Sequence, residues 1–184
     1  MWGDGTGGPL ARFGGSALAG AVMAALWAMP AAAQQAQSQA SALVLEPMSL
    51  TNIEQLDFGS IIPSGTIGYV TVAASGAVTT SGGVIAASGD ARPARFAGQG
   101  SANRVIIKTG SSQIFLSGPG AQMSVDDFEI GALTGLSQLG NGNNYRITDA
   151  NGIVGFAVGG RLRVNANQAE GDYSGSFSVT FNYQ

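Results

Sequence analysis

The chain has 184 residues, a formal net charge of −3 and a single lysine, and it contains neither histidine nor cysteine. Nucleic acid and anionic membranes are poor partner candidates, because both bind proteins through clustered Lys and Arg. The missing residue types also exclude the commonest general base, the thiolate nucleophile, the usual zinc ligands and any disulfide.

The amino-terminal segment is typical of a secretory signal. Arg12 precedes an apolar run from Ala17 to Met29, and three small residues follow at positions 31–33. A transmembrane anchor needs about 20 apolar residues, and this run is shorter. We therefore expect residues 1–33 to be a signal peptide that is cleaved before Gln34. The mature protein should cross the periplasm to the cell surface or the medium, with no membrane insertion after signal removal.

The next segment, residues 34–48, has two interpretations. It is either an N-terminal arm that is donated to another chain or the first strand of the domain at residues 49–184. Gln34 to Ser41 is polar and rich in Gln, so a donated arm would have to use the apolar side chains of Ala42, Val44 and Met48.

Strand signals separated by turn signals fill the rest of the chain. Connections are predicted at residues 64–66, 76–83, 117–120, 140–144 and 149–152, since Gly and Asn tolerate positive φ and Ser favours turns. The predicted strands are Leu50 to Phe58, Ile67 to Ala73, Ala94 to Ala97, Arg104 to Lys108, Gln113 to Leu116, Gln122 to Ile130, Ile153 to Val164 and Asp172 to Tyr183. Short strands at this spacing, rich in Val, Ile, Phe and Thr, predict an all-β sandwich.

The last predicted strand, Asp172 to Tyr183, has the most regular pattern. Polar residues alternate with Tyr173, Phe177, Val179, Phe181 and Tyr183, and Gly175 is the one gap in the apolar series. Side chains alternate between the two faces of a strand, so one face should be buried and the other solvated. Only Gln184 follows, and an unpaired edge here would be a template for another chain.

The core should contain apolar side chains from several of these strands. We expect Phe58, Ile106, Val164, Phe177, Val179 and Phe181 to be buried, and truncation of Phe177 or Phe181 to Ala to cost about 3–5 kcal/mol.

Residues for chemistry are sparse. The only acidic cluster is Asp126, Asp127 and Glu129, which with Asp57 or Asp149 would offer oxygen ligands for weak Ca²⁺ binding. A solvated turn is the favoured interpretation, because the cluster lacks the D-x-D-x-D-G pattern of a calcium loop. An enzyme is the least favoured class, and we expect no cofactor.

Three segments carry a resemblance. Leu56-Asp57-Phe58-Gly59, the strand from Val158 to Val164 and the terminal run from Gly171 to Tyr183 resemble a family of exported bacterial proteins, known only as a domain of unknown function (number four-four-zero-two). More distantly, the chain is similar to spore coat protein U and to chaperone-usher pilin subunits. That second resemblance implies an incomplete immunoglobulin-like β-sandwich, which a periplasmic chaperone and then the arm of the next subunit complete by strand addition.

Two functions follow as expectations. The favoured one is a structural subunit of a bacterial surface fibre or coat, a pilus-like homo-oligomer that functions in cell adhesion. Its partner-strand residues would be Tyr173, Phe177, Val179, Phe181 and Tyr183. The alternative is a self-closed secreted surface or matrix protein that binds a carbohydrate or a protein partner through its loops.

Overall fold

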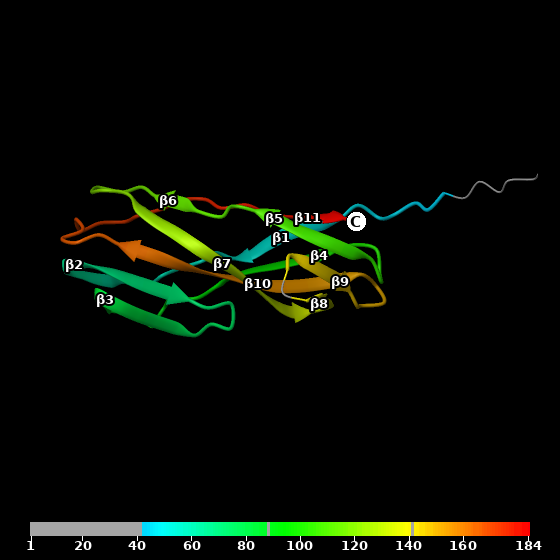
Figure 1. The fold of residues 1–184 in the computed structure, drawn as a ribbon, viewed down its shortest axis with the longest axis horizontal. Coiled ribbons are helices and arrows are strands. Elements are labelled where there is room, and N and C mark those ends of the chain that lie inside the picture. Colours follow the sequence, from blue (N-terminus) through cyan, green and yellow to red (C-terminus); the bar gives the residue numbers. More distant parts are fainter. Residues whose placement is uncertain (1–41, 88, 141) are drawn as a thin grey trace, which may run out of the picture. The chain divides into compact units, whose positions relative to one another are not determined.

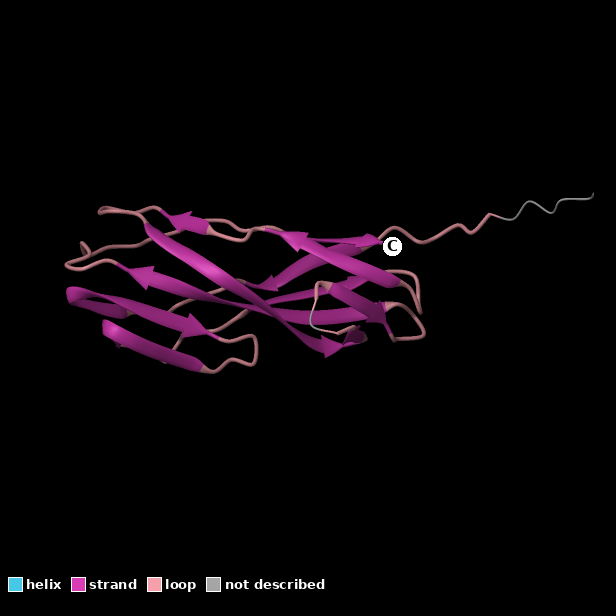
Figure 2. Cartoon of the chain, in the orientation of Figure 1, coloured by secondary structure: helices cyan, strands magenta, loops and turns pink. Residues whose placement is uncertain are grey.

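The computed structural model describes residues 42–184 except 88 and 141, and this part of the chain is built from eleven β-strands without a helix (Figure 1, Figure 2). The predicted signal peptide and Gln34 to Ser41 lie outside the described residues. The strands are β1 (Ser49–Glu54), β2 (Ile61–Val72), β3 (Val78–Ala86), β4 (Ala94–Gln99), β5 (Val105–Gly110), β6 (Ile114–Leu116), β7 (Met123–Thr134), β8 (Leu136–Gln138), β9 (Asn144–Ile147), β10 (Ile153–Val164) and β11 (Val179–Tyr183).

The first sheet has seven strands arranged around β10. One side of β10 pairs with β4 along Ile153–Val158 and then with β2 along Gly160–Val164, and its other side pairs with β7. Three outer strands complete the sheet: β1 on β4, β3 on β2 and β6 on β7. Two residues of β7, Asp127 and Phe128, lie opposite Gly160, and this β-bulge bends the long strand pair.

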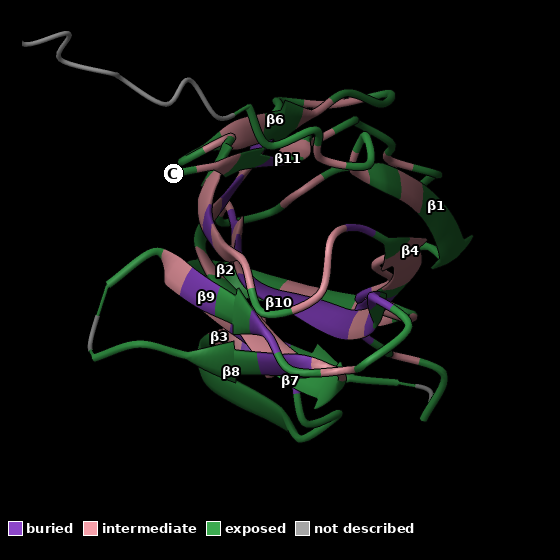
Figure 3. Ribbon diagram, turned by 90° about the vertical axis from the view of Figure 1, so that its right-hand side faces the viewer, coloured by how far each residue is buried: buried purple, intermediate pink, exposed green. Residues whose placement is uncertain are grey.

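The second sheet has four antiparallel strands in the order β11-β5-β9-β8. It faces the part of the first sheet formed by β4 and the first half of β10. The prediction of an all-β sandwich is therefore confirmed. Figure 3 shows buried residues concentrated along β10 and β9.

Two clusters of apolar side chains form the interior. The first core joins the two sheets and consists of Ala94, Ile106, Leu136, Tyr145, Ile147, Val154, Phe156, Val158 and Phe181. The second core lies against β2, β3, β7 and the second half of β10, and consists of Phe58, Val70, Val72, Val84, Met123, Val125, Leu162 and Val164.

Four of the six predicted core residues are buried: Phe58, Ile106, Val164 and Phe181. Phe177 and Val179 were expected to be buried and are only half-buried. Both pack at the margin of the first core, beside the edge of β11 where no further strand of the described chain pairs.

The prediction of connections at 64–66 and 76–83 is wrong. Residues 64–66 lie inside β2, opposite a register shift, and most of 76–83 belongs to β3. The segment Val78–Ala86 is rich in Ser, Thr and Gly because it is an outer strand with most of its residues exposed. Two short strands of the second sheet, β8 and β9, were not predicted.

The prediction of a single strand from Asp172 to Tyr183 is also wrong in its first half. Regular pairing begins at Val179, and before it only an isolated bridge joins Ser174 to Ser117. The segment changes neighbours: Tyr173 packs on the second core, whereas Phe177 packs on the first. The alternation of burial nevertheless persists along the whole segment, since its apolar side chains are buried or half-buried and its polar ones exposed.

Candidate functional site: the open edge of the terminal strand

Strand β11 is one of the two outer strands of the second sheet. It pairs with β5, from Val179 opposite Gly110 to Tyr183 opposite Ile106, and no other strand of the described chain pairs with it. The sequence left open whether the terminal strand has an unpaired edge, and in the part of the chain that the structure describes one edge of β11 is unpaired.

The hydrogen bonds at its two ends show which residues face β5. The Ser178 carbonyl accepts from the Ser111 N–H at 3.1 Å, and the Gln184 N–H donates to the Val105 carbonyl at 3.1 Å. In an antiparallel ladder every second residue bonds to the same neighbour. The backbone N–H and C=O groups of Val179, Phe181 and Tyr183 therefore point to the open side.

The side chains of these same residues point into the sandwich. Phe181 is only 5% exposed, and its ring packs edge-on against Phe156 and Tyr145, with centroids 5.1 and 5.8 Å apart. Val179 and Tyr183 are half-buried against the same core, whereas Thr180 and Asn182 are exposed. The edge thus combines free backbone groups with a strand anchored by its aromatic side chains.

Phe177 lies before β11 and makes ring contacts of its own. It stacks on Phe128 with centroids 5.1 Å apart and meets Phe96 edge-on at 6.2 Å, and Phe96 in turn stacks on Phe156 at 5.1 Å. The sequence did not single out Phe96, Phe128, Phe156 or Tyr145. Phe96, Phe128 and Phe156 lie in strands that were predicted, but nothing in the sequence shows that these strands meet.

Tyr173, the first of the predicted partner-strand residues, belongs to a different environment. Its hydroxyl donates to the Ala169 carbonyl at 3.0 Å and accepts from the Gly120 N–H at 2.9 Å and the Gln168 Nε2 at 2.8 Å. This network fixes a turn next to the second core. Tyr173 is therefore not part of the open edge.

The residues of the predicted donor arm differ in their burial. Met48 is half-buried and packs on the first core of its own domain, whereas Ala42 is exposed and Val44 is 91% exposed. The Tyr183 hydroxyl donates to the Glu46 carbonyl at 2.9 Å and accepts from the Ser101 N–H at 2.7 Å. Residues 42–48 therefore pass the end of β11 without pairing with its edge.

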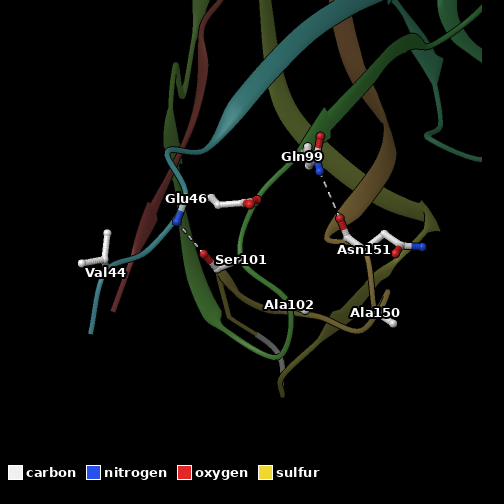
Figure 4. Close-up of a pocket in the computed structure, with 8 residues that line it drawn as sticks. Val44, Glu46, Gln99, Ser101, Ala102, Ala150 and Asn151 are labelled. Carbon is white, nitrogen blue, oxygen red and sulfur yellow. Dashed lines mark hydrogen bonds between the residues drawn. The ribbon is translucent and has the colours of Figure 1, made fainter. Parts of the chain in front are cut away.

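A shallow hollow of about 470 Å³ lies beside this contact (Figure 4). Two hydrogen bonds cross its lining: the Glu46 N–H donates to Ser101 Oγ at 2.8 Å, and Gln99 Nε2 donates to the Asn151 carbonyl at 3.2 Å. The hollow is open to solvent, and its lining is mostly polar. The residues that form it are Val44, Glu46, Gln99, Gly100, Ser101, Ala102, Ala150 and Asn151.

The acidic cluster is held by an arginine. Arg161 contacts Asp126 through Nε at 3.0 Å and Asp127 through a terminal nitrogen at 2.8 Å, while its guanidinium lies 5.4 Å from the centre of the Tyr69 ring. The hydrogen bond to Asp126 raises the pKa of Arg161. Within the described residues, no group of three or more acidic side chains is placed to hold a metal ion, so Glu129 does not join the two aspartates in a calcium site.

Comparison with known proteins identifies the family. A family model described as "Domain of unknown function (DUF4402)" matches residues 48–183, almost the whole described chain, and the protein belongs to that family. No curated protein and no solved structure matches the chain. Over residues 42–184 without 88 and 141, no helix is long and apolar enough to cross a membrane.

Proposed function

We propose that this member of the DUF4402 family is a structural subunit of a bacterial surface fibre or coat, in which subunits assemble by β-strand addition and support cell adhesion. The observation that carries the proposal is the open edge of β11. Its backbone groups at Val179, Phe181 and Tyr183 are directed away from β5, and its side chains anchor it to the first core.

An added strand would gain from both properties. Each outward residue offers one backbone donor and one acceptor, and each hydrogen bond so formed contributes about 0.5–1.5 kcal/mol net. The half-buried rings of Phe177 and Phe96, together with Val179, would lose further exposed surface under the new strand. Main-chain bonds would supply affinity, and the spacing of apolar side chains would set the register.

The proposed donor is the N-terminal arm of another copy, using the residues that precede Met48. Ala42 and Val44 are exposed and do not contribute to the fold of their own domain. Met48 is a poor donor residue, because it packs on its own first core. A periplasmic chaperone would cover the same edge after export and before assembly, so that the edge is not exposed to aggregation. Under this proposal the domain is an immunoglobulin-like sandwich that lacks one strand.

The test is a deletion of residues 34–44 in the full chain, with the signal at 1–33 kept for export. This deletion spares Glu46 and Met48, which the domain uses itself. The purified protein should not polymerise, and a free peptide of residues 34–44 should bind it and raise its melting temperature by mass action. A peptide in which Ala42 and Val44 are replaced by Asp is the matched control.

Two results would contradict the proposal. One is an undeleted protein that is a stable monomer and ignores the peptide. The other is an equal effect of the natural and the Asp-substituted peptide, which would show that binding does not use the apolar side chains.

A second candidate function rests on the polar hollow in Figure 4. Amide, hydroxyl and carboxylate groups of Gln99, Ser101, Asn151 and Glu46 surround it, and such groups suit a carbohydrate or a polar peptide. The protein would then be a self-closed secreted surface or matrix protein. Asn151→Ala and Gln99→Ala would abolish binding to a glycan array in this case and leave polymerisation unaffected.

A further inference from the structure

Another open edge lies in the first sheet, at the margin formed by β3. Strand β3 pairs with β2, and no other described strand pairs with it. With nine residues, β3 is longer than the other outer strands of the described chain, β1, β6, β8 and β11. Most of its residues are exposed, including Thr79, Thr80 and Ser81.

The hairpin that carries this edge is uncharged. The sequence from Phe58 to Gly89 contains no Asp, Glu, Lys or Arg. Natural sheets commonly protect outer strands with charged side chains or proline, and β3 has neither. By contrast, β1 ends at Glu54, which forms an ion pair with Arg95 at 3.0 Å. Between Val78 and Gly82 the edge of β3 therefore has neither of these two barriers to pairing with another strand.

The backbone groups of β3 alternate in a regular way. The Ala73 N–H donates to the Ala77 carbonyl at 2.8 Å, and the Ala87 N–H donates to the Ser60 carbonyl at 2.8 Å. Odd-numbered residues of β3 thus face β2, and the N–H and C=O groups of Val78, Thr80 and Gly82 face the open side. Val78 lies on the inner face, opposite the buried Val72, and is nevertheless 38% exposed.

We propose that β3 is a self-association surface, which pairs antiparallel with β3 of a second copy across a two-fold axis. An isologous contact requires a surface that is complementary to itself. With Thr80 opposite Thr80, the pairs are Thr79 with Ser81 and Val78 with Gly82. None of them brings like charges together, although the whole chain is acidic.

The partner is a second copy because of this self-complementarity. A strand with a charged outer edge would have to desolvate its charges against uncharged Thr and Val, and β3 offers no counter-charge. The bend at Gly82, where φ is +70°, limits the pairing to the segment around Val78–Gly82. This contact closes after two copies, so it differs from open-ended assembly at β11 and does not depend on it.

The test uses the absence of cysteine, which makes an introduced thiol unique in the chain. Thr80→Cys should form a disulfide-linked dimer on mild oxidation, seen on a non-reducing denaturing gel. Ser137→Cys is the matched control, because Ser137 is exposed on β8, which also has an open edge, and it should stay monomeric. A denaturing gel dissociates any assembly through β11, so the two contacts are read separately.

A charge at the same position gives the second measurement. In sedimentation velocity the smallest species of the unmodified protein should be a dimer, and that of Thr80→Lys should be a monomer. The melting temperature should not change. Equal cross-linking of the two cysteine variants would overturn the proposal. So would a Thr80→Lys protein that sediments like the unmodified protein while remaining folded.

Discussion

The hydroxyl of Tyr183 donates a hydrogen bond to the carbonyl of Glu46 at 2.9 Å, and it also accepts from the Ser101 N–H at 2.7 Å. One side chain thus ties the last strand to the segment before β1 and to the loop between β4 and β5. The contact keeps residues 45–48 at the end of β11, so that they leave its edge open instead of pairing with it.

Tyr183→Phe should destabilise the domain by about 1–3 kcal/mol, because the Ser101 N–H and the Glu46 carbonyl both lose their partner. The ring remains, so its packing on the first core is kept. Urea unfolding would measure the loss. Tyr69→Phe is the control, since it keeps the ring beside Arg161 and removes no hydroxyl contact of this kind. Equal midpoints for the two variants would show that the contact contributes nothing.

Phe181→Ala should cost about 3–5 kcal/mol, because the ring is buried between Phe156 and Tyr145. Phe177→Ala should cost less, about 1–3 kcal/mol, since the half-buried ring loses less contact when it is removed. Chemical denaturation of both variants tests this order. A larger loss of unfolding free energy for Phe177→Ala than for Phe181→Ala would contradict this order. It would mean that another chain covers the Phe177 ring in solution.

Val179→Pro and Thr180→Pro form a matched pair at the open edge. Proline removes one backbone N–H, which at Val179 points to the open side and at Thr180 points to β5. Val179→Pro should therefore keep the fold and weaken polymerisation, whereas Thr180→Pro should destabilise β11 itself. Circular dichroism and sedimentation would measure the two effects. Normal polymerisation of a folded Val179→Pro protein would argue against strand addition at this edge.

The stability of the domain should fall at alkaline pH through Tyr145. Burial raises the pKa of this phenol above its ordinary value of 10.0, so the folded state keeps the proton to a higher pH than the unfolded state. Stability from this group is full below about pH 10 and declines as the pH rises above it. Tyr145→Phe should remove this part of the decline. Unfolding free energies at about pH 8 and about pH 10.5 would compare the variant with the unmodified protein.

Much of the fold could be predicted from local patterns. The strand predicted at Ile153–Val164 has the same bounds as β10. Because β10 pairs with other strands along both edges, its sequence is mostly apolar residues and Gly, and the prediction of a strand has little ambiguity. The predictions failed where an exposed strand looks like a loop, as in the Ser, Thr and Gly-rich β3. They also failed for β9, which begins directly at the end of an Asn-rich turn.

The sequence by itself determined the all-β class, the alternation of buried and exposed side chains from Tyr173 to Tyr183, and the absence of histidine and cysteine chemistry. These properties depend only on which residues follow one another. The tertiary structure decided that Tyr173 and Phe177 pack on different cores, that Arg161 binds Asp126 and Asp127, and that β3 and β11 are outer strands. An edge is defined by the neighbour that a strand lacks, and pairing between distant segments is set by the register and twist of the whole sheet.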